Sequence, residues 1–289
     1  MNAGTALRQN VESDEITVLP GAFDALSARL ASDRFDAVFT SGFGLSASTL
    51  GLPDLGFLDR TANVDRVGDI TKACDAPVLA DADTGYGSAL NVRKTVEDMI
   101  DAGAGGVIIE DQVAPKRCGH MDEKRVVDED EARTRIRAAA DARDERSEDL
   151  VIVGRTDARE PRGMDAAVER GHALAEAGAD VIFVEAPESR EELERAGTSF
   201  NVPTFANMIE GGKTPYLSYD EVQELGFDVV VYPLSALFAY TRAVQDTYAA
   251  LADDGETSAV DKLSFDEYDD IIGADKYRGV AKEYAETHK

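Results

Sequence analysis

The chain has 289 residues, a hydrophobic content of 43% and a formal net charge of −27, which comes from 57 acidic and 30 basic residues. This length and apolar content are sufficient for one large domain with a sizeable core. The excess of negative charge argues against nucleic acid as a partner, because binding would bring like charges together.

The cysteines and the lengths of the apolar runs predict the cellular compartment of the protein. Cys74 and Cys118 are the two cysteines and give no disulfide framework. The N-terminal residues show no charged-then-apolar signal, and no apolar run is long enough to cross a bilayer. We therefore expect a cytoplasmic protein without a membrane partner.

Acidic residues are spread along the whole chain, and only nine of the 30 basic residues are lysines. This pattern is typical of a halophilic protein, in which concentrated salt screens the self-repulsion of a charged surface. An ordinary acidic enzyme is the alternative. The two differ in whether added KCl raises stability.

Short apolar runs rich in valine and isoleucine alternate with amphipathic stretches, which predicts parallel strands joined by crossover helices. Strands are expected at residues 17–20, 37–41, 78–81, 106–110, 151–155, 181–185, 204–207 and 229–232. Helices are expected at residues 60–73, 89–101, 129–142, 164–176 and 219–225. Eight such units predict an α/β fold, a closed (β/α)8 TIM-type barrel.

The C-terminal part has helical periodicity but no strand to cover. A long helix is expected at residues 235–251, followed by helices at 265–272 and 274–286. We interpret residues 1–289 as a single barrel domain with a helical extension from about 262 to 289. Tyr268, Ile271 and Ile272 need a surface to bury them, either on the same barrel or on a neighbouring subunit.

Polar side chains occur at the C-terminal ends of most predicted strands, and these ends meet at one mouth of a barrel. They are Ser41, Asp81, Asp83, Glu110, Arg155, Glu185, Asn207 and Glu210. Capping and salt bridges are the usual roles of such residues. A shared mouth would force the acids together, which indicates an active site containing a cation.

The acids among them predict the metal. Asp81, Asp83, Glu110 and Glu185 would supply about four oxygen-bearing side chains, more than Mg²⁺ usually takes directly, so some should act through bound water. Hard carboxylate ligands favour Mg²⁺ over zinc, with Mn²⁺ as the alternative.

A single thiol lies among basic groups in Lys116, Arg117, Cys118, Gly119 and His120. Such neighbours lower the pKa of a cysteine and allow it to exchange a proton near neutral pH. Packing is the usual role of a lone cysteine, but these neighbours make a poor apolar environment. Cys118 is therefore the expected proton donor, and Lys116, Arg117 and His120 its catalytic partners.

Two further segments indicate anion binding. Ser41, Gly42, Phe43 and Gly44 place small residues after a strand, where backbone amides can approach an anion. A turn would explain the glycines but not the serine. Arg155 can bind a carboxylate through two parallel hydrogen bonds, or can form a structural salt bridge to Glu110 or Glu185, and both roles can hold at once.

These segments, with Gly51 to Asp54, Glu110 to Gln112 and Arg155 to Ala158, closely resemble the isocitrate lyase and phosphoenolpyruvate mutase superfamily. The resemblance extends from about residue 19 to about residue 251, and Lys116 to His120 is the lyase-type version of its motif. It implies a domain-swapped homo-oligomer, expected here as a homotetramer, a dimer of swapped dimers.

The resemblance also implies roles for the site residues. Asp81 is the expected direct metal contact, with Asp83 and Glu110 holding coordinated waters. The expected substrate-binding residues are Ser41, Gly42, Phe43, Asp54, Arg155, Glu185, Asn207 and Glu210. Gly119 and the residues up to about Val127 are expected to form a mobile lid.

The reaction expected of such a site is cleavage of a carbon–carbon bond beside a hydroxyl group by reverse aldol or Claisen chemistry. The length and the thiol motif favour 2-methylisocitrate or isocitrate, with a 2-oxo acid and succinate as products. The segment from Asn207 to Pro215 instead resembles the branch acting on smaller dicarboxylates, namely 2,3-dimethylmalate, citramalate or oxaloacetate. A phosphonomutase is disfavoured because that branch lacks the cysteine motif.

Overall fold

The computed structural model describes residues 2–117, 119, 123–146 and 148–286. Cys118 and His120 lie outside this described part. The chain divides into two compact units, Met1–Leu237 and Phe238–Lys289. The first unit contains the whole barrel, and the second is helical.

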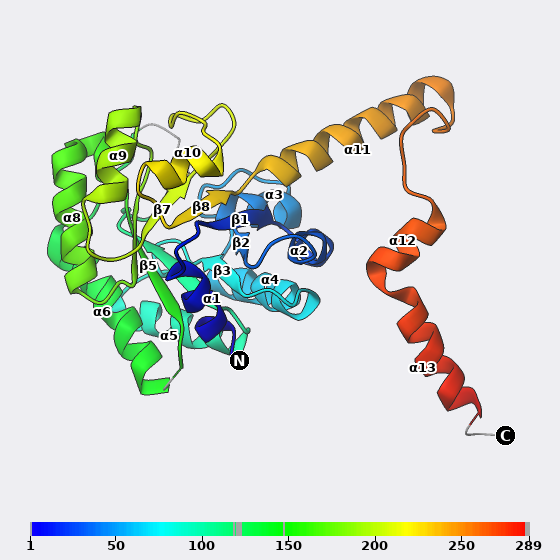
Figure 1. Ribbon diagram of the computed structural model, residues 1–289, viewed down its shortest axis with the longest axis horizontal. Helices are drawn as coiled ribbons and strands as arrows, with labels where there is room; N and C mark the ends of the chain where they lie inside the picture. Colours follow the sequence, from blue (N-terminus) through cyan, green and yellow to red (C-terminus); the bar gives the residue numbers. More distant parts are fainter. Residues whose placement is uncertain (1, 118, 120–122, 147, 287–289) are drawn as a thin grey trace. The chain divides into compact units, whose positions relative to one another are not determined.

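Eight parallel strands form the barrel, each paired with the next along the chain and the last with the first (Figure 1). They are β1 (Thr17–Ala22), β2 (Val38–Thr40), β3 (Val78–Asp81), β4 (Gly106–Glu110), β5 (Val151–Thr156), β6 (Val181–Val184), β7 (Thr204–Asn207) and β8 (Val229–Tyr232). All eight predicted strands are confirmed, with bounds that differ by at most two residues. The predicted α/β barrel is confirmed with them.

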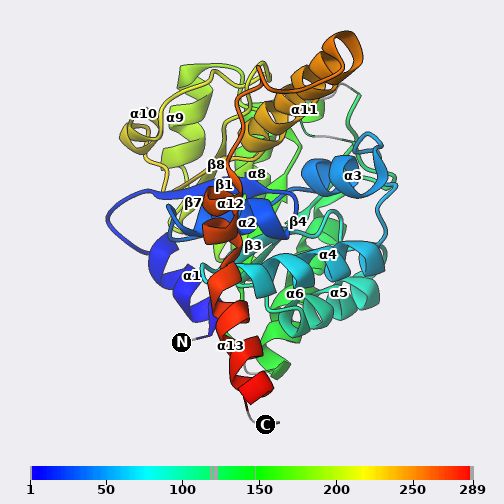
Figure 2. The same ribbon diagram turned by 90° about the vertical axis from the view of Figure 1, so that its right-hand side faces the viewer.

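The helices of the first unit surround the barrel. They are α1 (Ala3–Val11), α2 (Ala25–Ser32), α3 (Gly42–Leu50), α4 (Arg60–Ala73), α5 (Ala89–Asp101), α6 (Glu129–Arg146), α7 (Arg159–Arg162), α8 (Met164–Glu176), α9 (Arg190–Thr198) and α10 (Tyr219–Glu224). Helix α1 contributes Leu7 and Val11 to the inner core of the barrel. Helices α4, α5 and α6 lie side by side on one flank (Figure 2).

Local sequence explains the ends of these helices. Asp59 caps α4 by accepting a hydrogen bond from the backbone of Ala62, and α5 stops where Gly103 adopts a φ of +86°. Five helices were not predicted: α1, α2, α3, α7 and α9. They are short, with four to nine residues each.

Two apolar layers stabilise the barrel. The outer layer lies between the strands and the helices and includes Val96, Ile109 and Ile152. The inner layer fills the barrel with side chains such as Leu19 and Ile108, and Leu7 of α1 joins it. The interior is therefore a packed core, and its mouth is left for chemistry.

The second unit continues α11 (Ser235–Asp254) beyond Leu237 and contains α12 (Phe265–Ile272) and α13 (Ala274–Glu286). Ser264 and Glu267 form a capping box at the start of α12, which ends at Gly273 with a φ of +67°. The two predicted C-terminal helices are confirmed at their predicted bounds.

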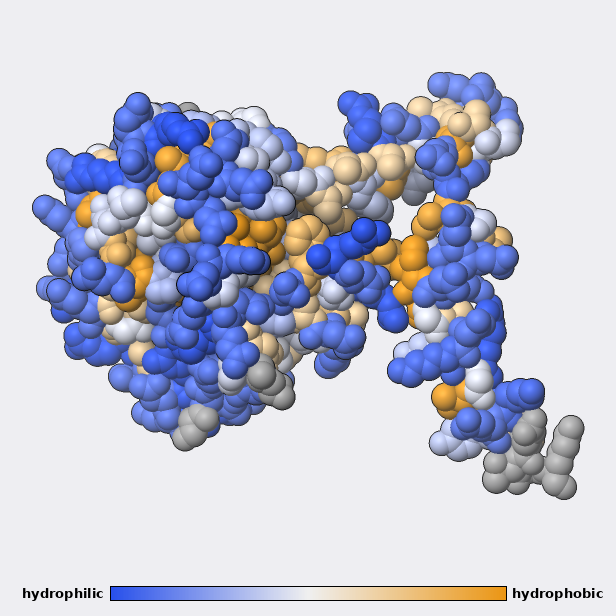
Figure 3. Space-filling view, viewed as in Figure 1, coloured by the Kyte–Doolittle hydropathy of each residue, from blue (hydrophilic) through white to orange (hydrophobic). Residues whose placement is uncertain are grey.

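The face of the barrel seen in Figure 3 is mostly hydrophilic, with scattered apolar areas. Among the described residues, no helix combines the length and apolar character that spanning a membrane requires.

Candidate active site

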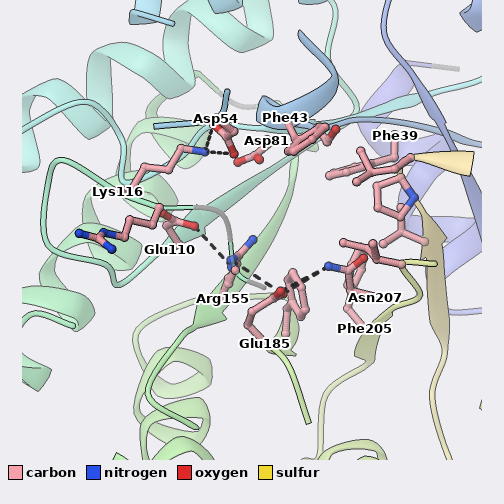
Figure 4. A pocket seen from close by; sticks show the side chains of 18 residues that line it. Phe39, Phe43, Asp54, Asp81, Glu110, Lys116, Arg155, Glu185, Phe205 and Asn207 are labelled. Atoms are coloured by element: carbon pink, nitrogen blue, oxygen red, sulfur yellow. Dashed lines mark hydrogen bonds and ion pairs between the residues drawn. The ribbon is translucent and has the colours of Figure 1, made fainter. Parts of the chain in front are cut away.

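A cavity opens at the carboxyl ends of the strands and is lined by residues from seven of them and from the following loops (Figure 4). The predicted site residues that line it are Ser41, Phe43, Asp54, Asp81, Glu110, Lys116, Arg117, Arg155, Glu185 and Asn207. The barrel therefore brings together most of the residues that sequence reasoning selected.

The remaining predicted residues fall into three groups. Gly42 and Asp83 lie directly against the ionic groups of the cavity. Glu210 is exposed and is absent from the lining; its carboxylate accepts hydrogen bonds from Tyr216 and Ser235. Cys118 and His120 lie outside the described residues.

Aromatic rings form the floor of the cavity. The ring centroid of Phe205 lies 4.7 Å from that of Phe183 and 6.4 Å from that of Phe39. Phe43 and Leu234 add to the apolar lining. In Figure 4, Phe39 and Phe205 lie on one side of the cavity, and Lys116 and Glu110 lie on the other. The cavity therefore offers an apolar wall and an ionic wall to the same ligand.

Lys116 is buried between two carboxylates. Its Nζ lies 2.6 Å from Oδ1 of Asp54 and 2.7 Å from Oδ1 of Asp83. Burial alone would lower the pKa of Lys116, but Asp83 and Asp54 outweigh it and hold that pKa well above the usual value. Lys116 is therefore a fixed positive charge at the cavity wall.

Gly42 is the first residue of α3, and its backbone lies close to Lys116 and the neighbouring carboxylates. Its N–H donates to Oδ2 of Asp81 at 3.0 Å. A Cβ at position 42 would lie 3.1 Å from Nζ of Lys116 and 3.2 Å from Oδ2 of Asp81. The glycine is needed because the helix terminus approaches the ionic groups so closely.

Ser41 has a structural role in addition to its place at the cavity. Its Oγ accepts a hydrogen bond from the backbone N–H of Gly44 at 2.9 Å and so caps α3. Capping is a structural role for the serine that sequence reasoning about a turn did not include. The hydroxyl hydrogen is not used by this bond and can serve a ligand.

Asp83 and Glu110 are buried acids with elevated proton affinity. Burial raises the pKa of Asp83 to about 6, and it raises the pKa of Glu110 well above its usual value. Oε1 of Glu110 has no hydrogen-bond partner among the described residues. A buried, unpaired carboxylate oxygen is costly and indicates that a donor or a cation belongs there.

We tested whether Mg²⁺ fits these residues. Among the described residues, no three acidic, histidine or cysteine side chains form a ready-made metal cluster. Asp81 lines the cavity, however, and Glu110 presents its unpaired oxygen nearby. Because Mg²⁺ usually keeps several waters and takes one or two carboxylates directly, this donor set fits the ion.

Arg155 binds several acids at once. Its Nε and Nη2 donate to the two carboxylate oxygens of Asp157 at 2.9 and 3.0 Å. Its Nε also lies 3.4 Å from Glu110, and its Nη2 lies 3.8 Å from Glu185. The predicted salt bridges to Glu110 and Glu185 are confirmed, and the bidentate hydrogen bonds of Arg155 are made with Asp157.

Burial alone would lower the pKa of Arg155, but Asp157 and Glu185 hold it well above the ordinary value. The guanidinium therefore stays charged throughout any reaction. Asn207 completes this side of the cavity, with its Nδ2 3.4 Å from Oε2 of Glu185 and its Oδ1 without a partner among the described residues.

Sequence reasoning assigned no role to three buried polar residues near the site. Asp157 follows Arg155 by two positions, and strand alternation would have placed both on one face. Lys124 and Gln112 hold the loop after β4 through hydrogen bonds to its backbone. A loop lysine and a loop glutamine carry no comparable pattern.

Cys74 behaves as expected for a structural thiol. It is half-buried, donates to the carbonyl of Ala76 at 3.3 Å, and has a pKa raised to about 11, chiefly by burial.

This fold and this mouth define a TIM-barrel enzyme whose active site is built from charged strand ends. Comparison with known proteins specifies the class. A family model described as phosphoenolpyruvate phosphomutase matches residues 7–252. The chain is 42% identical to 2,3-dimethylmalate lyase of Eubacterium barkeri over 288 residues, covering 99% of each. It is 38% identical to 2-methylisocitrate lyase of Halalkalibacterium halodurans, covering 97% of this chain and 93% of that one.

Solved structures agree with this result. An oxaloacetate acetylhydrolase in complex with 3,3-difluorooxalacetate superposes with a TM-score of 0.94 at 32% identity, covering 98% of this chain and 97% of the other. A phosphonopyruvate hydrolase in complex with oxalate and Mg²⁺ gives a TM-score of 0.88 at 30% identity, covering 99% and 100%. The chain belongs to the isocitrate lyase and phosphoenolpyruvate mutase superfamily, and within it to the carbon–carbon lyases.

Proposed function

We propose that this protein cleaves a methyl-bearing 2-hydroxy dicarboxylate of the 2,3-dimethylmalate type into a 2-oxo acid and a second carboxylate, with Mg²⁺ as cofactor. The observation that carries the proposal is the two-sided cavity, in which Phe39 and Phe205 lie on the side away from Lys116 and Glu110 (Figure 4). The ionic side suits carboxylates, and the apolar side suits methyl groups. The similarity to a 2,3-dimethylmalate lyase over 99% of both chains supports the same substrate class.

The residues of the chain divide the work as follows. The N-terminus of α3 and the hydroxyl of Ser41 would hold the carboxylate of the nascent 2-oxo acid. Gly42, whose N–H donates to Asp81, would leave room for that carboxylate because it has no side chain. Arg155 and Lys116 would orient the substrate as fixed positive charges. Asp81 would hold the Mg²⁺ directly, and Asp83 and Glu110 would hold its waters. Bound there, Mg²⁺ would supply Lewis-acid stabilisation of the oxygen that becomes a carbonyl.

The proposed reaction requires no oxidant or reductant. The substrate hydroxyl loses its proton to a base, and its oxygen becomes the carbonyl of the 2-oxo acid as the carbon–carbon bond breaks. The electron pair remains on a carbon next to a carboxylate, and a proton must then reach that carbon. We propose Cys118 as its donor, with Arg117 and His120 beside it; Cys118 and His120 lie outside the described residues.

Cleavage of 2-methylisocitrate, or of isocitrate, is the second candidate. Several relatives named 2-methylisocitrate lyase are 37–40% identical to this chain. A third carboxylate would need a further counter-charge, and Arg117 lines the same cavity. The exposed position of Glu210, hydrogen-bonded to Tyr216, does not favour a role for that residue at the distal carboxylate.

A substrate panel tests the proposal. The purified protein is incubated with Mg²⁺ and 2,3-dimethylmalate, citramalate, oxaloacetate, 2-methylisocitrate or isocitrate, and released 2-oxo acid is measured. The proposal predicts pyruvate and the fastest turnover with 2,3-dimethylmalate. Faster turnover of 2-methylisocitrate would favour the second candidate, and absence of product with every compound would refute both. Parallel reactions with EDTA, Mg²⁺ and Mn²⁺ test the metal.

We also propose a homo-oligomer in which the helices of Phe238–Lys289 pack against a neighbouring subunit. Within this unit Phe265 is 89% exposed and Tyr277 66% exposed, which is unusual for rings on amphipathic helices. Light scattering at high KCl tests this arrangement: a tetramer is expected, and a monomer would refute it.

A further inference from the structure

Residue 118 is flanked by two residues whose backbone is held by buried side chains. On the side of Arg117, the amide group of Gln112 forms two hydrogen bonds: Nε2 donates to the carbonyl of Arg117 at 2.8 Å, and Oε1 accepts from its N–H at 2.9 Å. Gln112 is only 1% exposed. The loop is thus fixed immediately before position 118.

On the other side, Lys124 holds Gly119. Nζ of Lys124 donates to the carbonyl of Gly119 at 2.6 Å and to Oδ1 of Asp157 at 3.0 Å. The side chains of Lys124 and Asp157 are both completely buried. A lysine is rarely buried in this way unless its charge is paired and its protons are satisfied.

The carboxylate that pairs with Lys124 also binds Arg155. Asp157 therefore links the backbone at Gly119 to the guanidinium that faces the cavity. The contact is close, because a Cβ at position 119 would lie 2.1 Å from Oε1 of Glu185 and 2.4 Å from Nη2 of Arg155. Gly119 is held between Lys124 on one side and these two cavity groups on the other.

The base of the loop is also closed. Gln112 and Val126 form an antiparallel bridge, and the backbone of Val113 donates to Arg125 at 2.8 Å. Residues 113–125 thus leave and return at one place, and Lys124 lies next to that junction. The bridge fixes only the two ends of the loop, whereas Gln112 and Lys124 hold Arg117 and Gly119 within it.

We propose that Lys124 and Gln112 are positioning residues of the lyase reaction, which fix the backbone on both sides of residue 118 relative to Arg155. Lys124 acts through the carbonyl of Gly119 and through Asp157, and Gln112 acts through both backbone polar groups of Arg117. Neither side chain lines the cavity. Removing either one should loosen the backbone beside residue 118 and reduce turnover more than substrate binding.

The test compares Lys124→Met, which keeps the approximate volume but removes the donors, with Lys124→Gln, which retains N–H groups. Lys94→Met is the matched control, because the ion pairs of Lys94 with Glu97 and Asp98 on α5 lie at the surface. Gln112→Met tests the other flank. Far-ultraviolet circular dichroism and a melting curve establish that each variant is folded.

The first readout is tryptic cleavage after Arg117, measured by mass spectrometry relative to cleavage after the exposed Arg242. We expect Lys124→Met and Gln112→Met to raise this ratio by about tenfold, with a smaller rise for Lys124→Gln and none for Lys94→Met. The second readout is steady-state kinetics. Lys124→Met should lower kcat by about tenfold or more with KM within about twofold, and Lys124→Gln should recover part of the loss.

An unchanged cleavage ratio in both Lys124→Met and Gln112→Met would overturn the proposal, whatever the activity. Wild-type kcat in Lys124→Met would overturn it as well. The kinetic readout rests on the proposed function, whereas the tryptic cleavage readout needs no substrate. A protein that turns over none of the panel but shows the expected cleavage ratios would therefore refute the proposed function alone. If Lys124→Met does not fold, Lys124→Gln and Gln112→Met carry the same test.

Discussion

Replacing Gly42 with alanine should damage the active site while leaving the fold almost intact. The new Cβ would lie 3.1 Å from Oδ1 of Asp83, 3.1 Å from Nζ of Lys116 and 3.2 Å from Oδ2 of Asp81. These separations are a few tenths of an ångström too short for comfortable contact. All three neighbours are ionic groups of the proposed metal and substrate site, so whichever group moves, the site changes.

The expected stability and activity effects differ in size. Alanine is favoured over glycine in a helix by about 1 kcal/mol, which offsets part of the crowding, so the free energy of unfolding should change by about 1 kcal/mol or less. A displacement of a few tenths of an ångström at the reacting groups should lower kcat/KM by about tenfold. The measurements are urea unfolding and coupled detection of released 2-oxo acid.

Gly68 in α4 supplies the matched control. An added Cβ there would have no neighbouring atom closer than 3.7 Å. Gly68→Ala should therefore raise the free energy of unfolding by up to about 1 kcal/mol and keep wild-type activity. Calorimetric titration with oxalate in the presence of Mg²⁺ provides a readout independent of the true substrate. Wild-type kcat/KM and wild-type oxalate affinity in folded Gly42→Ala would refute the reasoning.

Three further predictions concern charge. Lys116→Met should lower the free energy of unfolding by about 3–5 kcal/mol, because Asp54 and Asp83 are left without a counter-charge, and an unchanged urea midpoint would contradict this. Burial raises the pKa of Asp111 to about 6, so the folded state holds this proton more tightly than the unfolded state. The protonated carboxyl group therefore contributes to the free energy of unfolding below about pH 4, and this contribution, about 3 kcal/mol at most, is lost as the pH rises through 6. In urea unfolding, the free energy of unfolding of Asp111→Asn should decline less steeply than that of the wild type between these pH values. Identical slopes for the two proteins would exclude the effect. Finally, the net charge of −27 predicts a melting temperature that rises with KCl into the molar range, whereas a maximum near zero salt would indicate an ordinary acidic enzyme.

The barrel could be predicted from sequence because its strands are buried on both faces. Continuous apolar runs such as Val151 to Val153 leave a strong signal, and eight of them at regular spacing leave few alternative folds. The polar residues at their ends could be placed at one mouth for the same reason. Ten of the predicted site residues line one cavity because the topology brings all strand ends together.

The residues that sequence reasoning missed depend on contacts between distant loops. Lys124 looks like a surface lysine, and only the fold brings it to Asp157, 33 positions away. The sequence indicates no role for Asp157 beyond its place in a motif, whereas the structure shows that it binds Arg155. Glu210 shows the reverse case: it follows a strand, yet its carboxylate binds Tyr216 and Ser235 instead of lining the cavity.

The three rings beneath the cavity have a stereochemical consequence. Phe39, Phe183 and Phe205 close the barrel side, so in the proposed reaction a solvent-derived proton can reach the carbanion from the loop side only. Turnover in D2O should therefore install deuterium on one prochiral face and give a single enantiomer of labelled product. The handedness of that product would report directly on how the ligand lies across the phenyl groups.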